Sequence, residues 1–108
     1  MKAKEKDSRI ILIEKLETLT GYLEQCNVSP WSKYFRISLQ MIINRDGEGI
    51  NEILSYYGGM GSFNDLYISK LNGHSISEKD ESKVNRTISD LSNEIYMLCS
   101  EIKRELNK

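Results

Sequence analysis

Residues 84–106, "VNRTISDLSNEIYMLCSEIKREL", carry an apolar side chain at every third or fourth position. These apolar residues are Val84, Ile88, Leu91, Ile95, Leu98, Ile102 and Leu106. Because an α-helix brings residues three and four apart onto one face, the spacing predicts one long amphipathic helix. Ser77 and Asp80 have the spacing of a helix-start pair, and Lys103 and Arg104 suit the negative end of the helix dipole. We therefore expect a helix from about Glu78 to Leu106.

A second leucine stripe lies near the amino terminus. Its members are Leu12, Leu16, Leu19, Leu23 and Cys26. The spacing predicts a helix from about Asp7 to Cys26, capped by Asp7 or Ser8. Gly21 is an unfavourable helix residue, so we expect a bend or a close helix contact there.

Two shorter helices are expected between these long ones. Ser29 suits an N-cap and Pro30 the first helical position, which predicts a helix from Trp31 to about Asn44. Its apolar residues are Trp31, Phe35, Ile37, Leu39, Met41, Ile42 and Ile43, on more than one face, so we expect it to be the most buried helix. A further helix is expected over residues 49–57, ended by Gly58 in the left-handed conformation.

The fold class that follows is all-α: a single-domain bundle of about four helices over residues 1–108, with residues 1–7 flexible. The chain is 39% hydrophobic and 29% charged with a net charge of −1, which is typical of a soluble globular protein and gives no global field for nucleic acid. The apolar run "IILI" is too short for a signal peptide or a membrane span. We expect a cytoplasmic protein that binds neither nucleic acid nor membrane.

Metal and cofactor chemistry has little support. The chain has two cysteines, Cys26 and Cys99, and one histidine, without a CxxC motif. Structural zinc sites need four such ligands, so we expect no metal and no cofactor. Both cysteines lie on apolar stripes, and a disulfide between them is disfavoured in a reducing compartment without being excluded.

Residues 56–66, "YYGGMGSFNDL", contain three of the seven glycines. In "GGMGS" the backbone amides of a helix start could hold an anion, yet the P-loop lysine and its preceding strand are missing. The competing interpretation is a tight turn between two helices. Ser62 and Asp65 have capping-pair spacing, and we expect a helical turn in "FNDLYISKL" after it. Asn72-Gly73 predicts a second turn.

The polar residues near these turns include the types that act in catalysis. Ser62, Asp65 and His74 are the residue types of a hydrolase triad, and Asn64 lies beside them. A triad needs all three within mutual hydrogen-bond reach, whereas serine and aspartate at turns mostly bond to their own backbone. His74 follows a turn, where a histidine more often fixes a loop than acts as a base.

Seven of the nine aromatic residues fall between residues 31 and 67. They are Trp31, Tyr34, Phe35, Tyr56, Tyr57, Phe63 and Tyr67. Some must build the core, and the rest, beside a rigid turn, would suit protein docking because large rigid side chains dominate interface energetics.

The combination of Trp31, "DGEGINEILSYY", "GGMGSFNDL", "NGH" and a long final helix resembles a family of small bacterial proteins that is a domain of unknown function. The resemblance spans most of the chain and implies no catalytic or binding residues. In size and charge such proteins are similar to the immunity proteins of toxin systems, which is an analogy of general character.

Two function hypotheses follow. The first is a non-catalytic protein-binding domain whose partner is another protein, such as a toxin. The second is a small-molecule or anion-binding protein, or a weak enzyme, that uses the "GGMGS" turn. The candidate binding residues are Trp31, Gly59, Met60, Gly61, Ser62, Phe63, Asn64, Asp65, Tyr67 and His74. A homodimer through the last helix is a further possibility.

Overall fold

The long carboxyl-terminal helix predicted from the sequence is α4, Glu78–Leu106. It belongs to a computed structural model that describes residues 2–58 and 61–107. Within those residues α1 spans Lys2–Gln25, α2 Trp31–Ile43 and α3 Glu48–Ser55, followed by the 3-10 helix η1 at Phe63–Asp65. The prediction of an all-α bundle with about four helices is confirmed.

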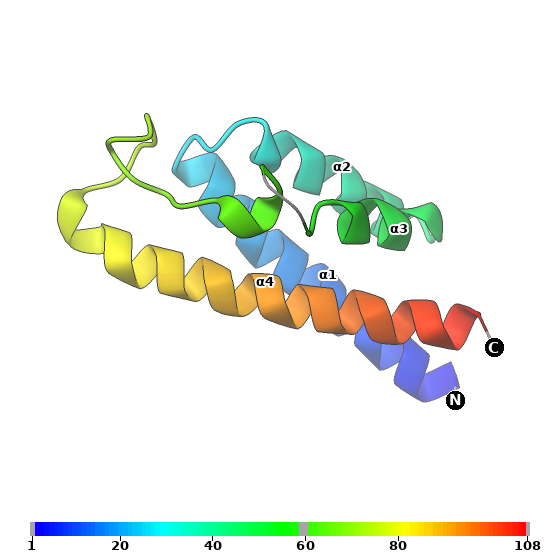
Figure 1. Cartoon of the computed structure of the whole chain (residues 1–108). Helices are drawn as coiled ribbons and strands as arrows, with labels where there is room; N and C mark the ends of the chain where they lie inside the picture. Colours follow the sequence, from blue (N-terminus) through cyan, green and yellow to red (C-terminus); the bar gives the residue numbers. More distant parts are fainter. Residues whose placement is uncertain (1, 59–60, 108) are drawn as a thin grey trace.

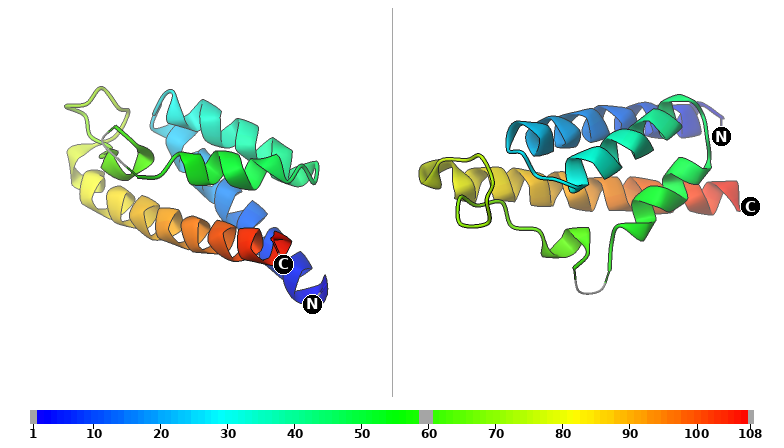
Figure 2. Two further views of the ribbon diagram at one scale, coloured as in Figure 1. Left: turned by 45° about the vertical axis from the view of Figure 1, so that its right-hand side comes forward. Right: turned by 90° about the horizontal axis from the view of Figure 1, so that it is seen from above.

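The four α-helices contact one another in a closed ring, each packing on its neighbours in the chain and α4 returning to α1. The two long helices, α1 and α4, run in opposite directions, so both termini lie at the same end of the molecule (Figure 1). Seen from above, α2 doubles back along α1, and α3 lies over the carboxyl-terminal half of α4 (Figure 2). The molecule measures 45 × 25 × 20 Å. This ring places the segment 56–66 beside both α2 and α4.

The core is built from the predicted stripes. Leu12, Leu16, Leu19 and Leu23 of α1 are all fully buried. Opposite them α4 buries Ile88, Ile95 and Cys99. Of its other stripe residues, Leu106 is 62% exposed, and those partly buried against the same cluster are Val84, Leu91, Leu98 and Ile102. Burying a leucine side chain stabilises a fold by about 1.5–3 kcal/mol, so these stripes carry much of the stability.

The starts of α1 and α2 differ from the predictions. α1 begins at Lys2, so Asp7 and Ser8 lie inside it and do not cap it. Pro30, not Ser29, is the N-cap of α2, and its carbonyl accepts hydrogen bonds from the amides of Lys33 and Tyr34. A proline has no amide hydrogen to leave unsatisfied, which suits the end of a helix.

The expectation that α2 is the most buried helix is wrong. Its buried residues are Phe35, Ser38, Leu39 and Ile42, and Ile37 and Ile43 are 53% and 40% exposed. α2 packs on α1 and α3, and among the described residues no further helix packs closely on it. The apolar residues on its outer face therefore remain at the surface.

The close helix contact expected at a glycine occurs at Gly49 and not at Gly21. A Cβ added at Gly21 would meet nothing within 4 Å, so the expected close helix contact there is wrong. The close contact is at Gly49 of α3, where a Cβ would come 2.9 Å from Ile42 Cδ1 and 3.0 Å from Met41 Cβ. The absence of a side chain at Gly49 lets α3 pack tightly against α2.

The two predicted turns are confirmed at Gly58 and Gly73. Gly58 follows α3 with φ of +89°, and Gly73 has φ of +84° in the loop before α4. Glycine adopts this left-handed conformation at no steric cost. The segment after the glycine turn is a short 3-10 helix, Phe63–Asp65, with an extended Leu66 after it, so the helical turn expected in "FNDLYISKL" is confirmed for its first three residues.

Cys26 and Cys99 are both buried free thiols. Burial raises the pKa of Cys99 to about 12, which keeps the thiol protonated and unreactive near neutral pH. In the part of the chain that the structure describes, no helix has both the length and the apolar character needed to cross a membrane.

Candidate functional site

Two hollows flank the segment that joins α3 to η1. The first, which we call the aromatic hollow, has a volume of about 430 Å³ and lies between α2 and the start of the η1 segment. Its lining residues are Trp31, Tyr34, Ile37, Glu52, Ser55, Tyr56, Gly58, Gly61 and Ser62. Three of the predicted site residues, Trp31, Gly61 and Ser62, therefore meet at one surface.

The aromatic hollow is built on a cluster of packed rings. The Trp31 ring centroid lies 5.6 Å from that of Tyr34, 5.8 Å from that of Tyr56 and 5.3 Å from that of Phe63. Phe63 in turn packs edge-on against the fully buried Phe35, at 4.7 Å. These are favourable aromatic geometries, so the rings form a rigid floor.

Hydrogen bonds hold the same rings in place. The Tyr56 hydroxyl donates to the Tyr34 carbonyl oxygen at 3.0 Å and also shares a hydrogen bond with Ser38 Oγ. Tyr56 thereby ties the end of α3 to the middle of α2. Burial raises the pKa of Tyr56 above its ordinary value, so the hydroxyl keeps the proton that it donates.

Part of the aromatic hollow is open to solvent. Tyr34 is 42% exposed and Ile37 is 53% exposed. Beside them, Ser62 Oγ is shielded from solvent and has no hydrogen-bond partner among the described residues. Exposed large apolar side chains beside an unsatisfied hydroxyl are features of a surface that a second molecule can cover.

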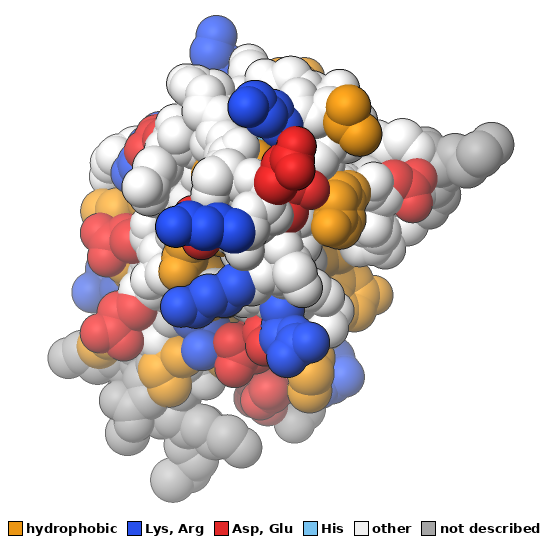
Figure 3. All heavy atoms as spheres, turned by 90° about the vertical axis from the view of Figure 1, so that its left-hand side faces the viewer, with side chains coloured by type: hydrophobic (Ala, Val, Ile, Leu, Met, Phe, Trp, Pro, Cys, Tyr) orange, Lys and Arg blue, Asp and Glu red, His pale blue; other side chains and the backbone are white. Residues whose placement is uncertain are grey.

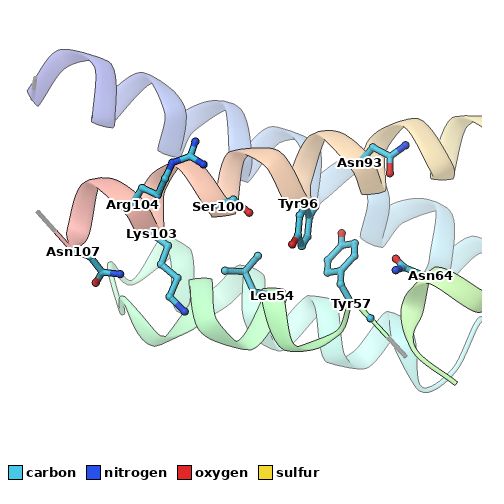
Figure 4. A pocket seen from close by; sticks show the side chains of 10 residues that line it. Leu54, Tyr57, Asn64, Asn93, Tyr96, Ser100, Lys103, Arg104 and Asn107 are labelled. Atoms are coloured by element: carbon cyan, nitrogen blue, oxygen red, sulfur yellow. The ribbon is translucent and has the colours of Figure 1, made fainter. Parts of the chain in front are cut away.

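The second hollow, which we call the polar groove, lies between α3 and α4 and has a volume of about 510 Å³. Its lining residues are Leu54, Tyr57, Gly58, Asn64, Asn93, Tyr96, Ser100, Lys103, Arg104 and Asn107. Figure 4 shows Tyr57 and Tyr96 facing each other across the groove, with Asn64 and Asn93 at one end and Lys103 reaching from α4 toward α3. Gly58 lines both hollows.

Tyr57 fixes the shape of the polar groove. Its hydroxyl donates to the Ser92 carbonyl oxygen at 3.0 Å, and its ring lies 5.0 Å from that of Tyr96. Burial raises the pKa of Tyr57 to about 12, so the hydroxyl remains a donor at any physiological pH. The wall of the polar groove is therefore held by a partly buried hydrogen bond from Tyr57, just after α3, to the backbone of α4.

The charges in the polar groove are of one sign. Lys103 and Arg104 line it, and no aspartate or glutamate is among its described lining residues. The described part of the chain holds two ion pairs, Lys15 with Glu94 and Arg36 with Glu24, and neither involves these cations. By contrast, on the end of the molecule seen in Figure 3 the Lys and Arg side chains lie among Asp and Glu.

The glycine turn itself differs from the predicted cap. Ser62 makes no side-chain capping bond to η1. Instead Asp65 Oδ2 accepts a hydrogen bond from the Gly61 amide at 2.8 Å, so the carboxylate closes the turn from its far side. Gly59 and Met60 lie outside the described residues. One of the amides proposed to hold an anion is thus already bonded to a carboxylate.

Ser62, Asp65 and His74 do not form a catalytic triad in this structure. His74 Nδ1 accepts a hydrogen bond from the Ser69 amide at 3.1 Å, which fixes the loop between η1 and α4. Within the described part of the chain, no hydrogen bond joins the side chains of Ser62, Asp65 and His74, and the one bond between these residues runs from the Asp65 backbone amide to the Ser62 carbonyl oxygen. His74 acts here as the loop-fixing residue considered from the sequence.

The remaining predicted residues lie in different places. Phe63 is 3% exposed, and its ring packs against the ring of Trp31. Asn64 is exposed and lines the polar groove. Tyr67 is 51% exposed but lines neither hollow, and its carbonyl oxygen accepts a hydrogen bond from Asn72.

Sequence reasoning missed the α4 side of the polar groove. Besides Arg104, its residues there are Asn93, Tyr96, Ser100, Lys103 and Asn107, which recur at spacings of three and four. This is a polar stripe beside the apolar one on the same helix. The pattern was visible in the sequence, but a polar stripe usually means a solvated face, and only the packing of α3 turns it into a groove wall.

Protein-family models give a match to the middle of the chain. The model described as a domain of unknown function, DUF6966, matches residues 24–77, half of the chain. The chain belongs to the DUF6966 family. No curated protein and no solved structure matches it.

The DUF6966 match contains most of the residues discussed above. It runs from the end of α1 through α2, α3 and η1 to the residue before α4. The whole lining of the aromatic hollow falls inside it, whereas the α4 wall of the polar groove falls outside it. The expected relation to an uncharacterised family is confirmed.

Proposed function

We propose that this DUF6966 protein is a non-catalytic domain that binds another protein through the aromatic hollow. The observation that carries the proposal is the exposure of Tyr34 and Ile37 on a floor of packed rings. Tyrosine and tryptophan are enriched among the residues that dominate binding energy at interfaces, and a fixed ring loses little conformational entropy when a partner covers it.

The rigidity of the floor supports the same proposal. Trp31 touches four rings, and Tyr56 is hydrogen-bonded to α2 at two points. A surface that is already in its bound shape gains affinity because less ordering accompanies binding.

The alternative, an anion or small-molecule site in the "GGMGS" turn, has weaker support. Asp65 bonds to the Gly61 amide and brings a negative charge to the turn. A carboxylate beside the amides opposes a second anion through like-charge repulsion. We therefore favour protein binding over the anion site.

The partner class we propose is a protein toxin, which this chain would neutralise in the cytoplasm of a bacterium. Support comes from the analogy of size and slightly acidic charge with immunity proteins. We also propose that "GGMGSFNDL" is a sequence mark of the DUF6966 family. A homodimer stays a prediction that sedimentation analysis tests.

The test is co-expression of the chain with the product of the neighbouring gene, followed by affinity capture and a growth assay. The hollow variant carries Tyr34→Ala and Ile37→Ala. The matched control carries Leu71→Ala and Met97→Ala, which remove side chains that are 98% and 63% exposed and line neither hollow.

We expect the wild type and the control to capture the partner and protect growth. The hollow variant should lose capture by about tenfold or more, the usual effect of removing central interface residues. Equal capture by all three proteins would refute the aromatic hollow as the surface. Absence of any partner and of any protection would refute the proposed function.

A further inference from the structure

We propose that the polar groove is a second binding site, for an acidic, extended segment of a partner protein. It differs in position and chemistry from the aromatic hollow, and it does not depend on the proposed function. The proposal rests on the charge, the length and the unused hydrogen-bonding groups of the groove.

The first argument is charge complementarity. Lys103 and Arg104 line the groove without a carboxylate among its described lining residues. Both lie in the last turn of α4, where they complement the helix dipole, and neither forms an ion pair with a described residue. Carboxylates of a bound segment would supply one, and close pairs across an interface give specificity and fast association.

The second argument is the supply of unused hydrogen-bonding groups. Asn64 and Asn93 are exposed, and their side-chain amides have no hydrogen bond to any described residue. An asparagine amide offers both a donor and an acceptor, which is what the backbone of an extended peptide requires. By contrast, the side-chain amide of Asn85 is bonded to both backbone groups of Ile68 and to the carbonyl oxygen of Glu81.

The third argument is shape. From Asn93 to Asn107 α4 rises about 21 Å, since each residue adds about 1.5 Å. An extended chain covers that length with about six residues. Leu54 and the facing rings of Tyr57 and Tyr96 give the groove an apolar midsection, against which one large side chain of the segment would pack.

A nucleic acid would also meet cations, amides and aromatic rings, but the charge is too small for it. Two cations line the groove and the net charge of the chain is −1. Binding to nucleic acid depends on neutralising several phosphates along a basic surface. An acidic peptide needs no more than the two cations present.

The experiment selects peptides of random sequence, about 12 residues long and displayed on phage, against the immobilised full-length chain. Enriched peptides are synthesised with a fluorescent label, and their affinities are measured by anisotropy. The groove variant carries Lys103→Gln and Arg104→Gln. Its matched control carries Lys79→Gln and Lys83→Gln, the same charge change on exposed residues of the same helix outside the groove.

We expect the selected peptides to be rich in aspartate and glutamate. Their affinity should fall roughly fivefold or more in the groove variant, because two ion pairs are lost, and by less than about twofold in the control. Binding should also weaken as NaCl rises from about 0.05 M to about 0.5 M. The hollow variant with Tyr34→Ala and Ile37→Ala should bind as the wild type does, which separates this site from the aromatic hollow.

Amide chemical shifts give a second readout that needs no variant. A bound peptide should move the side-chain amide signals of Asn64 and Asn93 and leave that of Asn85 in place. The proposal is overturned if no peptide is enriched, if enriched peptides lack acidic residues, or if the two asparagine signals do not move. It is equally overturned if a labelled single-stranded oligonucleotide competes with the peptide and depends on Lys103 and Arg104 to the same degree.

Discussion

The substitution Gly→Ala should have opposite effects on stability at Gly49 and at Gly21. Both glycines lie inside helices, where alanine is intrinsically favoured by about 1 kcal/mol. At Gly21 the added methyl group meets nothing within 4 Å, so Gly21→Ala should raise the free energy of unfolding by about 0.5–1 kcal/mol.

At Gly49 the methyl group would lie 2.9 Å from Ile42 Cδ1 and 3.0 Å from Met41 Cβ. Ile42 Cδ1 is the end of a side chain and can turn aside, but Met41 Cβ moves only with the backbone of α2. Overpacking of this kind costs about 1–3 kcal/mol, which outweighs the propensity gain. Gly49→Ala should therefore lower the free energy of unfolding by about 1–2 kcal/mol.

Urea unfolding followed by circular dichroism measures both values, with the wild type as reference. In thermal unfolding each 1 kcal/mol should shift the midpoint by about 4 °C in a domain of this size. The two variants should move in opposite directions. If Gly49→Ala stabilised the protein as much as Gly21→Ala does, the close packing of α3 on α2 would be refuted.

Three further predictions concern buried contacts. Tyr57→Phe removes a hydrogen bond to α4 and should lower the free energy of unfolding by about 1–2 kcal/mol in urea titrations, whereas Tyr67→Phe, at an exposed ring, should change it by less than about 0.5 kcal/mol. Because burial raises the pKa of Tyr57 to about 12 and that of Cys99 to about 12, the unfolded chain loses these protons first, so stability should fall as pH rises from about 9 to 12. Tyr57→Phe should flatten that alkaline decline in urea titrations at successive pH values, and an unchanged slope would contradict it. Asn85→Ala removes hydrogen bonds to both backbone groups of Ile68 and should lower the free energy of unfolding by about 2–3 kcal/mol. Hydrogen exchange of the Ile68 amide should become faster. Unaltered exchange at Ile68 would show that these two hydrogen bonds do not stabilise the loop.

Helix identity could be predicted from the sequence because it depends on local spacing. α4 begins and ends where the apolar stripe and its flanking charges indicate, and Gly58 adopts the conformation expected after α3. Helix α1 starts earlier than expected, since a cap-forming residue such as Asp7 can also lie inside a helix. Periodicity identifies a face, and the ends of a helix depend on weaker signals.

The candidate site could be predicted only in part, because it depends on which faces are covered. Ile37 counts as apolar in any pattern, but its exposure follows from the packing of α2 on α1 and α3 alone. The sequence indicates only that Lys103 interacts favourably with the dipole of the last helix. Lys103 becomes part of a groove because α3 lies alongside α4. Asp65 has capping spacing from Ser62, yet its carboxylate bonds backward to Gly61.

Hydrogen–deuterium exchange of the chain, alone and with the product of the neighbouring gene, tests the aromatic hollow most directly. We predict slower exchange in the first two turns of α2 and around Gly61 and Ser62, with α1 unchanged. Protection confined to α1, or none at all in a mixture shown to form a complex, would contradict binding at the aromatic hollow.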